Sequence, residues 1–188
     1  MYLATTDAAN DLLERDPLAL LMGMLLDQQI PMEKAFTSPA VLAERMGGRL
    51  DAAVIAGTDP DDLEALFRER PALHRFPAAM AKRVQELCRI IVDQYDGDAA
   101  RVWSGVTSGK ELRERIDALP GFGEQKAKIF VALLGKQSGV QPKGWRQAAG
   151  DYGTAGYKSV ADVTDATSLV KVRAYKQQMK AAAKASAG

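Results

Sequence analysis

Two glycines flank Phe122 just before a lysine-containing helical stretch, and this arrangement suits the binding of an anion. Gly121 and Gly123 allow backbone angles that a Cβ atom forbids, and they let another backbone come close. Lys126 and Lys128 follow in the first turns of the expected helix. The first amides of a helix lack intrahelical partners, and the helix dipole makes that end partly positive. The sequence therefore predicts a phosphate-binding turn, against the alternative of an ordinary helix–helix corner.

A second group of chemically capable residues, Asp27, Gln28 and Gln29, ends a stretch that is otherwise apolar on all sides. An Asp-Pro pair caps the start of this stretch, and Pro31 breaks it. Because a helix that is apolar all round is buried, its polar end is expected to face a cleft. Burial would raise the pKa of Asp27 and suit it to acid–base chemistry. The alternative is a solvated helix end.

Helical periodicity dominates the chain and strand periodicity persists nowhere, which predicts an all-α fold. Ser108 and Glu111 form a capping-box pattern that starts one helix of the hairpin, Pro120 and Gly121 end it, and a second helix runs to Lys136. The sequence predicts further helices over residues 18–29, two short ones within 32–48, and others over 51–56, 61–70, 77–95 and beyond Thr164-Asp165, with fraying after Met179.

Length and composition favour one globular domain over residues 1–188, with lobes of about 16–105, 106–150 and 151–188. Apolar residues make up 47% of the chain and charged residues 26%. Cys88 is the single cysteine, so an internal disulfide and a cysteine-ligated zinc or iron–sulfur site are excluded. The longest apolar run is too short to span a bilayer, and no basic-then-apolar leader opens the sequence. The expected location is cytoplasmic.

Charge is divided unequally along the chain, although the net charge is only +1. Residues 1–75 contain 7 basic and 13 acidic residues, whereas residues 76–188 contain 18 and 11. The basic second half predicts a polyanionic partner such as nucleic acid. The alternative is that the two halves attract each other. His74 is the only histidine and is expected to be structural.

The segment LPGFGEQKA resembles the helix-hairpin-helix signature of the base-excision DNA glycosylase (HhH-GPD) superfamily, and in particular its endonuclease III-like members. The resemblance covers about residues 15–150 and implies a two-lobed, all-α fold. It implies that main-chain amides at Gly121, Phe122 and Gly123 bind a DNA phosphate. It also implies a K⁺ or Na⁺ ion on the carbonyls of Leu119 and Gly121, with no other metal or cofactor.

The same resemblance extends the expected DNA interface beyond the hairpin. Glutamines at the end of the buried helix would enter the space left by an extruded base, and residues 73–76 would hold a wedge that props the duplex open. The expected DNA-binding residues are Gln28, Gln29, Lys82, Arg83, Gly121, Phe122, Gly123, Gln125, Lys126, Lys128 and Arg146.

Both groups that the superfamily uses for catalysis are missing from their usual places. The aspartate position after the hairpin is occupied by Gln141, or by Lys143 when counted without a gap. The lysine-nucleophile position in the hairpin is occupied by Gln125, although a lysine follows it. The sequence leaves three replacements open: Asp27 as carboxylate, Lys143 as nucleophile and Asp151 folding back from a loop. A fourth alternative is that none of them is catalytic.

Two functions therefore follow from the resemblance. The first is a DNA glycosylase or abasic-site lyase that acts on a damaged or modified base flipped out of double-stranded DNA. The second is a catalytically inactive protein that recognises distorted or modified DNA. A third, weaker hypothesis is the processing of free nucleotides. A monomer that associates with the nucleoid when bound to DNA is expected, and the base it recognises cannot be read from the sequence.

Overall fold

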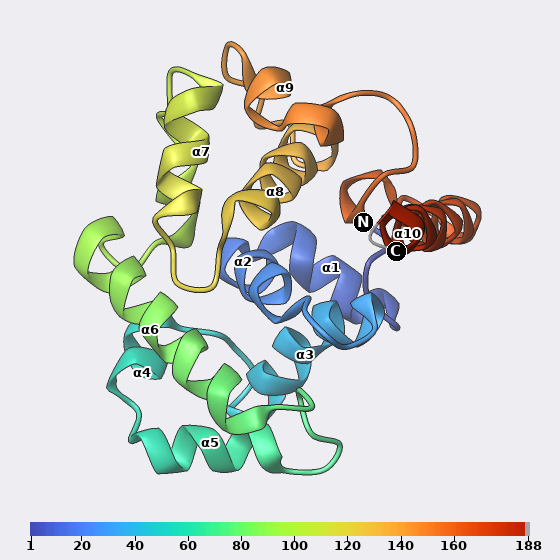
Figure 1. Cartoon of the computed structure of the whole chain (residues 1–188). Helices are drawn as coiled ribbons and strands as arrows, with labels where there is room; N and C mark the ends of the chain where they lie inside the picture. The colour runs from blue at the N-terminus through green and yellow to red at the C-terminus, as the bar shows by residue number, and fades with distance from the viewer. Residues whose placement is uncertain (187–188) are drawn as a thin grey trace.

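The computed structural model describes residues 1–186 and is built from helices joined by short loops (Figure 1). Within that range it contains no named strand, which confirms the all-α prediction. The α-helices are α1 (Asp7–Arg15), α2 (Pro17–Leu26), α3 (Met32–Arg45), α4 (Ala52–Gly57), α5 (Pro60–Arg68), α6 (Pro77–Tyr95), α7 (Gly109–Asp117), α8 (Glu124–Gln137), α9 (Trp145–Ala148) and α10 (Ala166–Ser186). Short 3₁₀ helices span Ala99–Val102, Gly150–Gly153 and Val160–Asp162.

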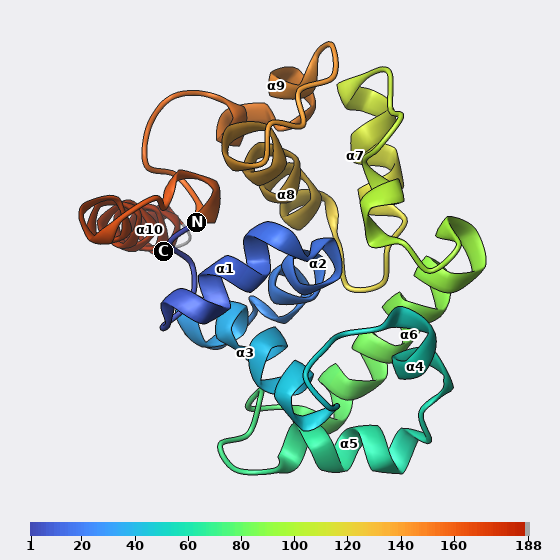
Figure 2. The same ribbon diagram turned by 180° about the vertical axis from the view of Figure 1, so that it is seen from behind.

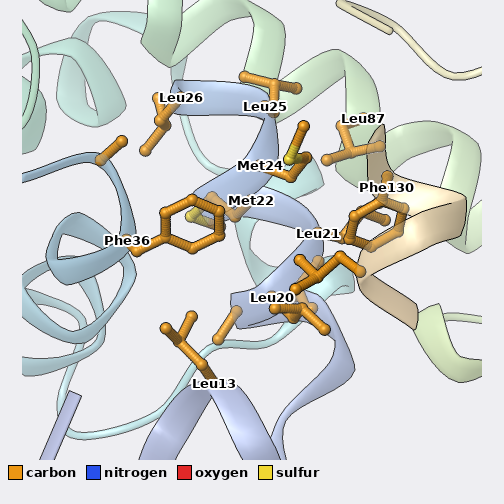
Figure 3. Close-up of a cluster of buried hydrophobic side chains, with 14 of the residues drawn as sticks. Leu13, Leu20, Leu21, Met22, Met24, Leu25, Leu26, Phe36, Leu87 and Phe130 are labelled. Carbon is orange, nitrogen blue, oxygen red and sulfur yellow. The ribbon is translucent and has the colours of Figure 1, made fainter. Parts of the chain in front are cut away.

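Helix α2 is the centre of the core. Asp16 caps it by accepting the amide protons of Leu18 and Ala19 at 2.9 and 3.3 Å. Every residue from Leu18 to Leu26 is buried, as an all-apolar helix requires. Figure 3 shows the helix between Phe36 of α3 on one side and Phe130 of α8 on the other. The burial of α2 therefore fixes where its polar end emerges.

Two groups of helices lie on opposite sides of α2 (Figures 1 and 2). One contains α7, α8 and α9, and the other contains α4, α5 and α6. Helix α10 follows a long excursion from α9 and is attached through buried Val172 and an ion pair between Arg173 and Glu33 of α3. None of the helices within residues 1–186 is long and apolar enough to cross a bilayer.

One local prediction is wrong: residues 32–45 form a single helix rather than two. Pro39 lies inside α3, although proline lacks the N–H that the preceding turn needs. Ser38 is buried beside it and donates its hydroxyl proton towards the carbonyls of Lys34 and Leu73, at 2.9 and 2.8 Å. The Ser-Pro pair therefore packs α3 against the loop before α6 instead of starting a new helix.

At both ends of the described chain the structure contains more helix than the sequence predicts. Helix α1 precedes the first helix that was predicted, and Thr6 caps it by accepting the Ala9 amide proton at 3.3 Å. Helix α10 continues to Ser186, beyond the predicted start of fraying at Met179. Residues 187 and 188, the last of the predicted frayed end, lie outside the described residues.

Candidate nucleic-acid interface and nucleotide pocket

The hairpin forms as the sequence predicts, with one change in its cap. Ser108 accepts the Glu111 amide proton at 3.1 Å and starts α7. The Glu111 carboxylate accepts the amide and hydroxyl protons of Thr107, one residue earlier than in a capping box. In the turn between α7 and α8, Gly121 has φ +79°, so its backbone does need a glycine. Gly123 has φ −89° and caps α8 in an extended conformation.

The amides available to an anion lie at the start of α8. The Phe122 amide already donates to the Leu119 carbonyl at 3.1 Å, and the Phe122 ring is buried edge-on to Phe130 with centroids 5.7 Å apart. The first helical hydrogen bond of α8 runs from the Ala127 amide to the Gly123 carbonyl at 2.9 Å. The amides between these points suit a phosphate, as at any helix start. Phe122 itself anchors the turn. The role predicted for its amide, and the predicted cation on the turn carbonyls, stay predictions.

The turn packs directly against the polar end of α2. A Cβ atom on Gly121 would lie 3.4 Å from Leu25 and 3.9 Å from the Arg83 side chain. Arg83 donates to the Gln28 side-chain oxygen at 3.1 Å, and the Gln28 side-chain nitrogen Nε2 donates to the Leu25 carbonyl at 2.9 Å. The structure thus brings Arg83, Gln28 and the hairpin turn together. Lys82, the neighbour of Arg83 on α6, is exposed and lies 4.0 Å from Glu86.

A pocket of about 980 Å³ opens beside this contact. Its walls are the end of α2, the first turns of α8, the segment 151–158 and α10. The volume lies at the upper end of the range that is usual for small-molecule sites. The predicted site residues that line this pocket are Asp27, Gln28, Gln29, Gln125, Lys126, Lys128 and Asp151.

Burial shifts the pKa values of two groups in this pocket, Lys126 and Asp27. Lys126 turns towards α2 and donates to the Leu25 carbonyl at 2.9 Å, where the dipole of α2 is negative. Burial lowers the pKa of Lys126 to about 8, although the charge of Asp27 acts in the opposite direction. Burial also raises the pKa of Asp27, opposed by the charges of Lys176 and Lys126. In this conformation Lys126 faces the pocket interior rather than a surface phosphate.

The turn after α2 is held in an unusual conformation. Gln29 is exposed at the pocket with φ +56°, which costs a residue with a side chain about 1 kcal/mol or more. His74 is buried, accepts the Phe76 amide proton on Nδ1 at 3.1 Å and donates from Nε2 to the Gln28 carbonyl at 2.9 Å. Burial lowers the pKa of His74, which favours this neutral form. His74 therefore ties the predicted wedge loop, where Arg75 lies over the Phe76 ring, to the pocket rim.

The remaining pocket residues have local partners. Gln125, at the position where the superfamily's nucleophile is expected, donates to the Tyr152 hydroxyl at 2.8 Å. Lys128 pairs with Glu124 one turn earlier at 2.7 Å. Asp151 is exposed at the pocket and lies in the 3₁₀ helix Gly150–Gly153 directly after α9, where the sequence predicts a loop; its catalytic role stays a prediction.

Lys143 and Arg146 lie outside this pocket. Helix α8 has 14 residues, so its two ends are separated by about 20 Å at 1.5 Å per residue, and both side chains follow its far end. The Lys143 carbonyl accepts the Gly109 amide proton at 2.8 Å, beside the start of α7. The Arg146 guanidinium lies 4.5 Å from the centroid of the Trp145 ring. Gln141, in the position of the missing aspartate, donates to the Gly135 carbonyl at 2.7 Å.

Sequence reasoning missed the wall that α10 contributes. Tyr175, Lys176 and Met179 line the pocket, and with buried Val172 they form one stripe of the helix. Their three- and four-residue spacing marks a shared face, but it does not identify the surface that the face covers. Lys158, also at the pocket, donates to the Thr154 hydroxyl at 2.8 Å.

Comparison with known families gives a match that spans all the pocket walls. The model of the HhH-GPD superfamily of base excision DNA repair proteins matches residues 22–187. The chain belongs to this superfamily. It is a DNA-binding protein of the base-excision-repair type, and the hairpin is the element on which the resemblance was founded. No curated protein and no solved structure matches the chain.

Proposed function

We propose that the pocket receives a nucleotide extruded from double-stranded DNA and that the protein removes a damaged or modified base, or cuts at an abasic site. A carboxylate and an amine line the same pocket from elements about a hundred residues apart: Asp27 follows α2 and Lys126 lies on α8. This juxtaposition is the main support for a catalytic function. The adjacent hairpin turn would hold a backbone phosphate and the protein would act as a monomer.

Asp27 would assist cleavage of the glycosidic bond. As the bond from the sugar to the base breaks, the base leaves with the bonding electron pair and the sugar becomes positively charged. A fixed carboxylate stabilises that charge and accepts a proton from the attacking water. The raised pKa of Asp27, caused by burial, brings it nearer to the range in which proton transfer is efficient.

Lys126 would supply the nucleophile of a lyase reaction. The free lone pair of an uncharged amine attacks the aldehyde carbon of the ring-opened abasic sugar, the aldehyde oxygen leaves as water, and a Schiff base results. Loss of a proton from the neighbouring sugar carbon then expels the 3′-phosphate and cuts the strand. A pKa lowered to about 8 by burial leaves a useful fraction of the amine uncharged near neutral pH. Lys126 would have to release the Leu25 carbonyl before it reacts.

The alternative function, DNA recognition without catalysis, also has a specific observation in its favour. The Lys126 amine satisfies one of the last carbonyls of α2, which is a sufficient structural reason for a partly buried lysine. Under this alternative Asp27 and Lys126 hold the pocket together, and modified DNA binds without turnover.

The deciding experiment is a cleavage assay on short duplexes that each contain one lesion: uracil, an oxidised purine, an alkylated purine, a mismatch or an abasic site. Alkali-treated samples separate base removal from strand cutting, and borohydride traps a Schiff base. A product that Asp27→Asn abolishes, and that Asp93→Asn on the exposed face of α6 leaves intact, supports a glycosylase. Borohydride-trapped adduct lost in Lys126→Gln but kept in Lys128→Gln supports a lyase. Tight, salt-sensitive binding to one lesion without product supports the recognition function.

A further inference from the structure

Helix α10 contributes one positive charge, that of Lys176, to the lining of the proposed nucleotide pocket. Val172 is buried and anchors the helix, and one turn further Tyr175, Lys176 and Met179 face the pocket. The charge of Lys176 acts on Asp27 across this space and opposes the rise in its pKa. Lys176 is itself exposed and makes no hydrogen bond or ion pair within the described residues, so its ammonium group is available to a ligand.

The pocket as a whole contains more positive than negative side chains. Lysines 126, 128, 158 and 176 line it, against the carboxylates of Asp27, Glu124 and Asp151. Glu124 is already held by Lys128 at 2.7 Å and by Arg113 at 3.5 Å. Asp27 lies under the influence of two lysines, and the Lys158 ammonium group donates to the Asp151 backbone carbonyl at 3.3 Å. A bound cation would therefore meet net repulsion.

The polar surface of the pocket also favours hydrogen-bond acceptors on the ligand. A lysine ammonium group only donates hydrogen bonds, and each glutamine side chain offers two donor hydrogens beside one carbonyl acceptor. Tyr152 and Tyr175 are the only aromatic residues in the described lining, and the Tyr152 hydroxyl is engaged by Gln125. Recognition of a cationic ring by a cage of aromatic faces has little basis in this lining.

On these grounds we infer that the pocket accepts uncharged or anionic damaged bases rich in carbonyl groups and rejects bases that carry a fixed positive charge. Lys176 is the specificity-determining residue that can be tested most cleanly, because its side chain is exposed and its replacement should not disturb folding. This inference rests on the proposed function, since it concerns which extruded base enters the same pocket.

The test uses two duplexes of identical sequence that differ in the charge of one base. The first contains a single 7-methylguanine, which carries a fixed positive charge. Mild alkali opens its imidazole ring to give the second, in which the formamidopyrimidine product is uncharged and of similar size. Affinity is measured by competition against a labelled duplex, and turnover by single-turnover kinetics. Because the phosphates are identical, the ratio between the two duplexes cancels backbone electrostatics.

We expect the uncharged lesion to be bound or processed at least tenfold better than the cationic one. Lys176→Glu should reduce that ratio at least threefold, and Lys176→Gln should fall between the wild type and the glutamate variant. Lys180→Glu makes the same charge change on α10 outside the described pocket lining and should leave the ratio unchanged.

The experiment distinguishes failure of the charge selection from failure of the proposed function. Equal use of both duplexes, or preference for the cationic one, overturns the charge selection while any product still upholds the proposed enzyme. A ratio that responds equally to Lys176→Glu and Lys180→Glu assigns the effect to general charge and overturns the role of Lys176. If neither duplex is processed nor bound better than the unmodified duplex, the charge selection is overturned, whereas the proposed function is overturned only if the full lesion panel also gives neither product nor binding.

Discussion

Replacing each glycine of the hairpin turn by alanine should give clearly different losses of stability. Gly121 has φ +79°, a left-handed conformation that costs a residue with a Cβ atom about 1–2 kcal/mol. The new Cβ would lie in ordinary van der Waals contact with Leu25 at 3.4 Å, so the cost comes from the backbone conformation. Gly123 has φ −89° with nothing within 4 Å of the added atom. There the weaker capping by alanine and the reduced entropy of the unfolded chain nearly cancel.

We therefore expect Gly121→Ala to lower the free energy of unfolding by about 1–2 kcal/mol and Gly123→Ala to change it by less than about 0.5 kcal/mol. Urea unfolding followed by circular dichroism measures both, with a DNA-binding titration of each variant alongside. Because Gly121 lies between α2 and Arg83, its variant should also weaken DNA binding. A Gly123→Ala variant that loses as much stability as Gly121→Ala would refute the conformational account of the turn.

Two further predictions concern the packing that positions the pocket. Gly23→Ala should cost about 1–3 kcal/mol, because its Cβ would lie 2.6 Å from the Phe36 ring between α2 and α3; a fall in Tm measures this. Asp162→Ala should cost about 3 kcal/mol by leaving Lys136 without its buried partner at 2.5 Å, and the 151–158 wall should become more accessible to protease. An unchanged protease pattern would mean that this ion pair does not hold the wall.

Local rules predicted the elements that carry the chemistry. Asp16-Pro17 and Ser108 start helices where they were expected, because a cap depends on a few neighbouring residues. The apolar run in α2 predicted burial and an emerging polar end for the same reason. The chemistry at Asp27 was therefore visible in sequence, although the residues opposite it were not.

These local rules do not predict contacts between segments that are distant in the sequence. The direction of the Lys126 side chain depends on the Leu25 carbonyl, 101 residues earlier in the chain. The same limit applies to Lys176, whose helix face could have covered any part of the molecule. Counting along the sequence points to Lys143, but its backbone pairs with that of Gly109 at the start of α7, and it does not line the pocket. The two helices predicted within residues 32–48 are one helix with Pro39 inside it, because Ser38 makes a buried contact with the Leu73 carbonyl, 35 residues away, that local rules do not contain.

The stability of the protein should depend on pH through Lys126. Burial lowers the folded-state pKa of Lys126 from 10.5 to about 8, whereas the unfolded chain keeps the ordinary value. Between these values the unfolded state binds more protons than the folded state, so the free energy of unfolding rises with pH across this window. At 1.36 kcal/mol per pKa unit, the full contribution is about 3 kcal/mol.

Lys126→Met removes this pH-dependent contribution. Between pH 7 and pH 10.5, the free energy of unfolding of the wild type should therefore rise by about 3 kcal/mol relative to that of the variant. Urea unfolding at several pH values measures the gain, and Lys128→Met, which removes a lysine of the same helix that is paired with Glu124, is the matched control. If the difference in the free energy of unfolding between the wild type and Lys126→Met does not change with pH, the Lys126 amine keeps its ordinary pKa in the folded protein. A lysine so unperturbed would be almost fully protonated at neutral pH, and the nucleophile assigned to it would lose its physical basis.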